Sequence, residues 1–273
     1  MSKLLIGIIG CGAIGTSLAK AIAKDFSGLA KVSALYDVDP AKAQKLSRVI
    51  SINRNIAAKN LAQIINNSAL VIESASSYCS FDIAKAVLAK GRDILIMSVG
   101  GVSAHIDELS SKARKNNAKI YIPSGAIAGI DALKAASAGD LKKVVLTTRK
   151  NPASFKGVKF IEDKKIDLAA IRKDTVLFSG PASEAVKYFP QNINVAAVLS
   201  IAGLGARKTF VKIIAAPLIK RNVHEIMIES NSATISTRTE NVLHPDNPKT
   251  SFLAVLSAIA VLKQILVPLK VGT

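Results

Sequence analysis

The chain of 273 residues contains no tryptophan, and aromatic residues together make up only 4% of it. Apolar residues nevertheless account for 49%, so the sequence can bury a substantial core, and that core is expected to be aliphatic. Cysteine is equally scarce, with Cys11 and Cys79 far apart in the chain. Two such residues form neither a metal-ligand pattern nor a disulfide framework, which indicates a reducing compartment, the cytoplasm.

Long apolar runs are also missing. The longest, residues 252–269, is interrupted by Ser257, Lys263 and Gln264, and it falls short of the ~20 apolar residues that a membrane helix needs. The chain enters an apolar segment at Leu4 without the basic region and cleavage site of a signal peptide. We therefore expect no membrane span and no membrane partner.

Acidic residues are few: 19 Asp and Glu stand against 37 Lys and Arg, for a net charge of +18. Such a charge can serve nucleic-acid binding, but the basic residues are scattered, and no DNA- or RNA-binding motif accompanies them. We expect a basic surface that attracts anionic dinucleotides and diacids, and no nucleic-acid partner. A dinucleotide-sensing regulator that binds nucleic acid is the alternative from another functional class.

The strongest motif is a glycine-rich turn near the N-terminus. Residues 4–9 form an apolar run typical of a buried parallel strand, and residues 16–23 carry apolar side chains at helical spacing. Between them lies Gly10-x-Gly12-x-x-Gly15. Strand, glycine turn and helix together are the context of a dinucleotide-binding fingerprint.

Each residue of this turn has a physical role in such a site. Gly10 permits the tight turn, Gly12 lets a pyrophosphate approach the backbone, and Gly15 lets the helix pack close to the strand. Ala13 and Ile14 open the helix, whose N-terminal N–H groups and dipole face the phosphates. The turn is therefore the expected pyrophosphate site.

A second apolar strand, residues 31–36, ends at Asp37, about the expected ~20 residues beyond the glycine turn. A carboxylate there can accept hydrogen bonds from the ribose hydroxyls and repels a 2′-phosphate. This favours NAD as the cofactor, with NADP possible. The structural alternative is a helix-capping Asp before Asp39-Pro40.

Strand and helix patterns alternate through the first half of the chain. Strands are also expected at 69–73, 94–97 and 119–122, and helices at 41–48, 81–89 and 106–116. The alternation predicts an α/β fold with a doubly wound parallel sheet, whose ligand lies beyond the carboxyl ends of the strands. The loops there bring Ser74, Ala75 and Ser98 into the cofactor site; helix capping by serine is the alternative.

After residue 125 the pattern changes to that of a second, α+β domain. Strands are expected at 143–148, 176–180, 208–215, 225–228 and 233–239, and helices at 126–138, 182–188, 195–204 and 251–266. The last helix is expected to pack back on the first domain. The domains are therefore expected at 1–124 with 247–273, which bind the dinucleotide, and at 125–246, which carry catalysis and dimerisation.

Five segments, at 10–15, 123–133, 189–197, 221–226 and 247–251, together resemble L-aspartate dehydrogenase, the short NAD(P)-dependent type. They follow the family's order along nearly the whole chain. The resemblance implies oxidation of L-aspartate to iminoaspartate, which water converts to oxaloacetate and ammonia, and the reverse reductive amination. It also implies a Rossmann domain completed by the C-terminal helix, an α+β domain and a homodimer. In that family the histidine matching His224 is the proposed acid/base, and residues matching Ala126 and Asn194 contact the dinucleotide.

The chain departs from the family's pattern at two places. Ala216, before Pro217, replaces a usual acidic residue, and the segment 229–233 replaces glycines that often follow the histidine segment. Both departures bear on substrate choice. Another imine or aldehyde oxidoreductase with the same two-domain plan is the nearest enzymatic alternative.

The chain has only three histidines. His105 is expected on the surface at a helix start, and His244 in a polar turn before Pro245. His224 begins a strand of the second domain, and an ordinary pKa near ~6.5 makes histidine the usual proton shuttle at neutral pH. We expect His224 to be catalytic; a structural histidine is the alternative.

A dicarboxylate substrate needs cationic partners, because an unpaired carboxylate is expensive to desolvate. Lys249 is the expected partner, with the hydroxyls of Thr250 and Ser251. Arg149 and Lys150 are further candidates, for which a solvated basic face is the alternative. No cluster of metal-ligating residues stands out, so no metal is expected.

Overall fold

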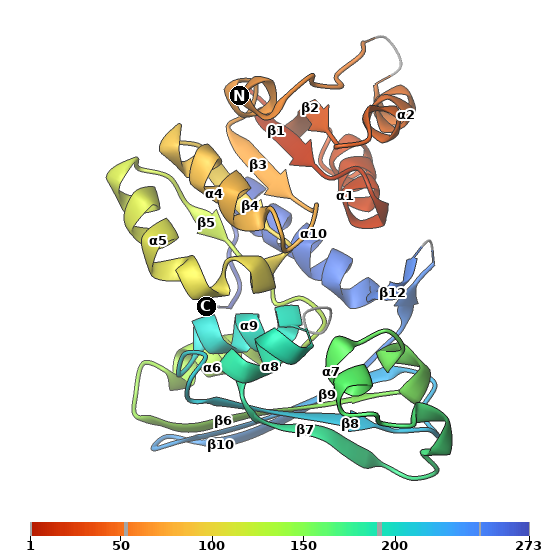
Figure 1. Ribbon diagram of the computed structural model, residues 1–273. Coiled ribbons are helices and arrows are strands. Elements are labelled where there is room, and N and C mark those ends of the chain that lie inside the picture. The colour runs from red at the N-terminus through yellow and green to blue at the C-terminus, as the bar shows by residue number, and fades with distance from the viewer. Residues whose placement is uncertain (1, 52–53, 190–192, 246, 273) are drawn as a thin grey trace. The chain divides into compact units, whose positions relative to one another are not determined.

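The computed structural model describes residues 2–51, 54–189, 193–245 and 247–272, and for residues 193, 248 and 249 the main chain only. Contacts divide the chain into two compact units (Figure 1). Unit 1 comprises Met1–Pro123 and Val255–Lys270, and unit 2 comprises Ser124–Ala254 and Val271–Thr273. The C-terminal part of unit 1 thus begins at Val255, inside the last helix. The boundary expected from the sequence was residue 247.

Unit 1 is built on a five-stranded parallel sheet in the order β2-β1-β3-β4-β5. The strands are β1 Leu4–Ile9, β2 Ala30–Tyr36, β3 Leu70–Glu73, β4 Asp93–Ile96 and β5 Ile120–Tyr121. Their apolar runs suit a sheet that is buried on both faces, and the expected doubly wound α/β fold is confirmed. The chain adds β2 on one side of β1 and β3 on the other. Ligands of such sheets bind beyond the carboxyl ends of the strands at this reversal.

The helices of unit 1 present apolar stripes at helical spacing. They are α1 Ala13–Lys24, α2 Pro40–Ile50, α3 Leu61–Asn66, α4 Ser80–Ala89, α5 Ile106–Lys115 and most of α10 Phe252–Leu266, with 3-10 turns η1 Val99–Gly101 and η2 Ser103–His105. In α10 the buried residues are Val255, Ala258 and Leu262. Helix α3 was not predicted from the sequence. Its N-cap is Asn60, whose side chain accepts the N–H of Gln63 at 2.9 Å.

Unit 2 contains a mixed five-stranded sheet in the order β10-β9-β6-β8-β7, in which only β6 and β8 are parallel. The strands are β6 Leu141–Lys150, β7 Thr175–Pro181, β8 Thr209–Ala215, β9 Asn222–Ser230 and β10 Thr234–Asn241; β11 Leu243–His244 and β12 Asn247–Ser251 form a separate pair. The predicted second domain with strands in one sheet is therefore confirmed.

Helices lie over one face of the unit 2 sheet, and no described helix of this unit lies over the other (Figure 1). They are α6 Ile130–Ala136, α7 Lys159–Asp163, α8 Ala182–Tyr188 and α9 Ile193–Ala202, with 3-10 turns η3 Pro152–Phe155 and η4 Leu168–Ala170. The core beneath these helices was expected to be aliphatic, but it also contains packed aromatic rings. Phe155 and Phe178 pack edge-on against Phe189, with ring centroids 6.3 and 5.8 Å away.

The helix expected at 126–138 is shorter, because residues 125–129 form a loop. Gly125 and Gly129 have φ of +70° and +96°, a backbone region that side chains with a Cβ disfavour. A Cβ on Gly129 would also lie 2.9 Å from the Thr237 side chain. The loop is tied to β10, since Thr237 Oγ1 donates to the carbonyl of Ala128 at 3.1 Å.

His244 does not lie in the polar turn that the sequence suggested. It belongs to β11 and is buried, and its ring packs against Phe252 at 5.4 Å between centroids. His105 is exposed, as expected.

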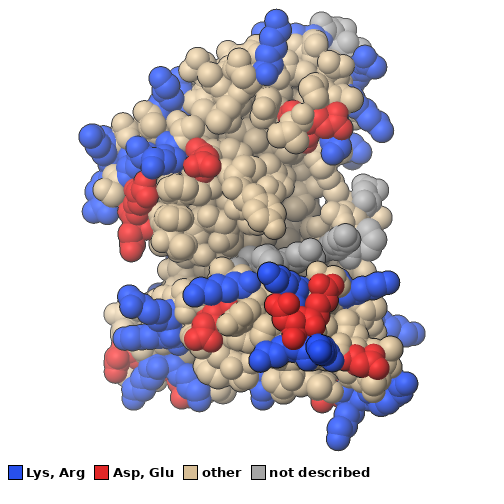
Figure 2. Space-filling model, in the orientation of Figure 1, with Lys and Arg blue, Asp and Glu red and all other residues tan. Residues whose placement is uncertain are grey.

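On the face shown in Figure 2, basic side chains are spread over both units, and acidic side chains lie among them in both. Among the described residues, no helix is both long enough and apolar enough to span a bilayer.

Candidate active site

The glycine turn lies between β1 and α1, at the carboxyl edge of the unit 1 sheet. Two of its glycines are required by the protein itself: a Cβ on Gly10 would lie 2.4 Å from the Ser74 carbonyl oxygen, and one on Gly15 would lie 1.9 Å from that of Gly10. A Cβ on Gly12 would meet no atom within 4 Å. The protein leaves open space at the one position where a pyrophosphate approaches the backbone.

The start of α1 is suited to an anion. Gly12 is its N-cap and provides no side-chain cap, and the first turn, which includes Ala13 and Ile14, contains no acidic residue. The N–H groups at this end therefore face no competing carboxylate from their own helix, and phosphate oxygens can accept from them.

Asp37, just beyond β2, is held against the glycine turn. Its Oδ2 accepts the main-chain N–H of Cys11 at 2.7 Å, and its Oδ1 accepts that of Asp39 at 2.9 Å. A carboxylate has about four acceptor positions, so capacity remains for ribose hydroxyls. The capping role belongs instead to Asp39, whose side chain accepts the N–H of Ala41 at 3.1 Å.

Cys11 is an unreactive thiol in this turn. Its burial, and secondarily the charge of Asp37, raise its pKa to about 12. Because only the thiolate is a nucleophile, Cys11 is a packing residue of the turn.

The predicted loop residues after β3 and β4 lie close to the turn. Ser74 Oγ donates to the carbonyls of Ile9 and Gly10 at 3.1 and 2.9 Å. The Ala75 N–H and the Ser98 N–H and hydroxyl all donate to the buried carboxylate of Glu73. Glu73 was not predicted from the sequence, although an acidic residue that ends an otherwise apolar strand is the signal that could have identified it.

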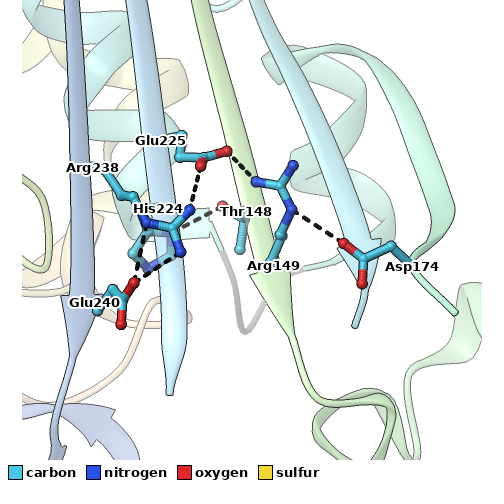
Figure 3. A network of polar contacts seen from close by, with 7 residues as sticks. All are labelled: Thr148, Arg149, Asp174, His224, Glu225, Arg238 and Glu240. Atoms are coloured by element: carbon cyan, nitrogen blue, oxygen red, sulfur yellow. Dashed lines mark hydrogen bonds and ion pairs between the residues drawn. The ribbon is translucent and has the colours of Figure 1, made fainter. Parts of the chain in front are cut away.

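In unit 2, His224 is buried on β9, and its Nδ1 lies 3.0 Å from Thr148 Oγ1 on β6 (Figure 3). Strand register aligns Thr148, His224 and Thr239 across β6, β9 and β10. Burial, and then the charge of Lys150, lower the pKa of His224 to about 3. His224 is therefore neutral at physiological pH, and the ordinary pKa assumed from the sequence does not apply.

Lys150 and Arg149 are neighbours in β6 but lie on opposite faces of its sheet, since side chains alternate along a strand. Lys150 shares the face of Thr148, and burial lowers its pKa to about 8. Arg149 instead pairs with Glu225, and with Asp174 at 3.4 Å (Figure 3). The structure therefore separates the two basic candidates and places Lys150 on the His224 face.

The Arg149 face carries a network of ion pairs. Glu225 also pairs with Arg238, which contacts Glu240 at 2.8 Å (Figure 3). Partial burial of Glu225 acts to raise its pKa, but the bonds from the two arginines outweigh it and hold the pKa below its ordinary value.

The remaining predicted residues are spread through unit 2. The carbonyl of Ala126 accepts a bond from the Asn241 side chain at 2.9 Å, and Asn194 lies in the first turn of α9. Thr250 Oγ1 accepts from Asn247 at 3.2 Å in β12, which ends at Ser251. The side chain of Lys249 lies outside the described part of the structure. The described residues contain no group of three or more His, Cys, Asp or Glu that could hold a metal.

Two family models together cover most of the chain. The NAD-binding domain of homoserine dehydrogenase matches residues 10–123, and the C-terminal domain of aspartate dehydrogenase matches residues 131–265. The first match contains the glycine turn and Asp37, and the second contains His224.

Relatives match over the full length. The L-aspartate dehydrogenases of Methanosarcina barkeri and Methanococcoides burtonii are 45% and 47% identical to this chain, covering 99% of it and 100% of each relative. The crystal structure of aspartate dehydrogenase from Thermotoga maritima matches with a TM-score of 0.74 and 25% identity, covering 99% of this chain and 100% of the other. An archaeal homoserine dehydrogenase in complex with NADPH shares the fold, with a TM-score of 0.60 and 15% identity.

Proposed function

This chain belongs to the L-aspartate dehydrogenase family, and we propose that it oxidises L-aspartate to iminoaspartate with NAD(P) and catalyses the reverse reductive amination of oxaloacetate. The observation that carries the proposal is the full-length similarity, whose matched range spans the glycine turn and His224. In this proposal unit 1 binds the dinucleotide, and unit 2 carries the acid/base and the dimer interface.

The residues of unit 1 suit a dinucleotide. The open space at Gly12 and the uncompensated N-terminus of α1 accept the pyrophosphate, and Asp37 accepts the ribose hydroxyls. When bound, the nicotinamide accepts or returns the hydride at its C4. Ala126 and Asn194 are proposed to contact the same cofactor from unit 2.

His224 is the proposed acid/base at the substrate Cα. In the oxidative direction water attacks the iminium carbon, and the imidazole takes a proton from that water; in the aminating direction it returns the proton as the carbinolamine loses water. The Thr148 hydroxyl suits both roles when it accepts from Nδ1–H, because Nε2 of the neutral ring is then free to take a proton. The imidazolium that forms keeps the same bond and can return the proton from Nε2.

Lys150 is the proposed partner of a substrate carboxylate, together with Lys249, Thr250 and Ser251. Lys150 lies on the His224 face, and its charge is already partly removed from water. A substrate carboxylate would stabilise that charge through a charge-assisted hydrogen bond. The same negative charge would favour protonation of His224 during amination.

The direct test is spectrophotometric. Purified protein should oxidise NADH in the presence of oxaloacetate and ammonia, and should produce aspartate. NADH oxidation that proceeds equally without ammonia would identify a 2-oxoacid reductase instead. Activity on neither substrate pair, with NADH bound, would favour another imine or aldehyde oxidoreductase.

The open face of the unit 2 sheet is the proposed homodimer surface. It exposes Phe210 by 43% and Val176 by 49% beside the Arg149 ion pairs. Light scattering should report a dimer for the wild type and a monomer for Phe210→Asp. If the variant is also a dimer, the interface lies elsewhere.

The proposed compartment is a reducing cytoplasm, which fits two free cysteines.

A further inference from the structure

Glu73 is a buried carboxylate that the proposed chemistry does not use. It ends β3, which lies between β1 and β4 in the sheet, and its side chain is fully inaccessible. A buried charge is costly unless hydrogen bonds satisfy it. Its partners therefore indicate why the sheet accommodates it.

Both carboxylate oxygens are acceptors for loops at the cofactor edge. Oε1 accepts the Ala75 N–H at 2.9 Å and the Ser98 hydroxyl at 2.9 Å, and Oε2 accepts the Ser98 N–H at 3.0 Å. Ala75 follows β3, and Ser98 follows β4. One side chain thus fixes the main chain of two loops that flank it.

The same network reaches the glycine turn. Ser74, between Glu73 and Ala75, donates its hydroxyl to the carbonyls of Ile9 and Gly10 at 3.1 and 2.9 Å. The loops that follow the neighbouring strands β1, β3 and β4 are therefore joined by hydrogen bonds, with Glu73 between them. No other described side chain in this edge bonds to both the Ala75 and the Ser98 main chain.

The hydrogen bonds to Glu73 do not fully offset the cost of burying its carboxylate. Burial raises its pKa, and the bonds from Ser98 and Ala75 only partly oppose this. An acid whose pKa is raised on folding adds stability below its unfolded pKa and loses it as the pH rises. Above its unfolded pKa, Glu73 therefore contributes less to the stability of the fold than it does in acid, which suits a residue kept for the geometry of a site.

We propose that Glu73 is a positioning residue for the dinucleotide, which holds the Ala75 and Ser98 loops in register with the glycine turn so that the cofactor finds a preformed edge. The inference rests on the proposed function only in assigning NAD(P) to unit 1. Glu73 touches neither substrate nor cofactor in this role, and it acts through the two loops.

Glutamine tests this role because it keeps the shape of Glu73 but has one acceptor oxygen. In either amide orientation, an NH₂ group faces the N–H of Ala75 or of Ser98, and one main-chain donor loses its partner. We expect Glu73→Gln to raise the Kd for NADH, measured by fluorescence titration without substrate, by about 10-fold. The kcat and the KM for oxaloacetate, measured at saturating NADH, should stay within about 2-fold, since the missing interaction belongs to the loops.

Two further variants define the outcome. Ser98→Ala removes one hydroxyl bond but keeps both main-chain pairs, so it should fold and weaken NADH binding less, by about 2- to 5-fold. Glu108→Gln alters an exposed glutamate of unit 1 paired with Lys85 and should change neither affinity nor melting temperature. If Glu73→Gln does not fold, Ser98→Ala decides the question.

A lower melting temperature for Glu73→Gln with an unchanged Kd for NADH would overturn the proposal and leave Glu73 a structural residue. An unchanged Kd for Ser98→Ala would do the same. Because the titration needs no substrate, a wild type that binds NADH but does not aminate oxaloacetate would refute the proposed function and leave this test intact.

Discussion

The main-chain N–H of Cys11 donates a 2.7 Å hydrogen bond to Oδ2 of Asp37, so the acidic residue after β2 is tied to the glycine turn after β1. These two residues follow different strands and become neighbours because β1 and β2 are parallel and adjacent. Asp37 therefore both shapes the turn and presents its remaining acceptor positions beside it.

Asp37 should set the choice between the two cofactors. We expect Asp37→Ala to raise the Kd for NADH by about 10-fold through lost hydrogen bonds to a charged acceptor, while the Kd for NADPH changes less because repulsion of its 2′-phosphate also disappears. Fluorescence titration measures both. Asp39→Ala is the matched control, since it removes a helix cap and should lower stability without changing the NADH to NADPH ratio. Equal losses for both cofactors in Asp37→Ala would reject its role in selection.

Gly12 and Gly15 should respond differently to a side chain. Gly12→Val places its side chain where the protein leaves open space, so it should fold and yet bind NADH about 10- to 100-fold more weakly by overfilling the phosphate site. Gly15→Ala puts a Cβ against the Gly10 carbonyl and should lower the melting temperature. Wild-type NADH affinity in folded Gly12→Val would show that the turn does not hold the pyrophosphate.

His224 should control turnover and not cofactor binding. We expect His224→Ala to lower kcat by about 10²–10⁴-fold, the range of general acid–base assistance, while the Kd for NADH stays near that of the wild type. Thr148→Val keeps the shape of its side chain but removes the partner of Nδ1, and it should reduce kcat less. Retention of most of the turnover by His224→Ala would exclude it as the acid/base.

His224 should also make the fold acid-sensitive in a defined window. Its pKa is lowered to about 3 on folding, so the unfolded chain binds the proton first, and stability falls as the pH drops from about 6.5 towards 3. Between pH 7 and 5 the free energy of unfolding should fall by about 2 kcal/mol from this source. The His224→Gln variant should not show this loss. Urea unfolding of both proteins at the two pH values measures the difference, and parallel losses would show that His224 is not the source.

Lys150 should affect substrate binding more than its neighbour does. Loss of a charge-assisted bond predicts that Lys150→Gln raises the KM for oxaloacetate by about 10-fold, with the Kd for NADH unchanged. Arg149→Gln is the matched control, because Arg149 pairs with Glu225 on the other face of the sheet. A larger KM effect from Arg149→Gln would reverse the assignment.

The sequence predicted those parts of the fold that depend on neighbours along the chain. The strand–glycine–helix segment was predictable because Gly10 and Gly15 are required by contacts within a few residues of the turn or with the adjacent strand end. The helix at 126–138 was predicted too long, since apolar spacing does not reveal that Gly129 adopts a positive φ against Thr237. His244 was misplaced because its burial against Phe252 depends on the pairing of β11 with β12.

The sequence by itself determined the cofactor class, because a fingerprint turn and a carboxylate at the end of the next strand are local features of one βαβ unit. Only the tertiary structure decided which polar groups work together. Thr148 and His224 meet because antiparallel register aligns β6 with β9, and strand alternation sends Lys150 to their face and Arg149 to the other. Glu73 is likewise identifiable only once β3 and β4 are paired, since its partner Ser98 lies 25 residues away. Such contacts depend on strand pairing, which residue spacing along the chain does not encode.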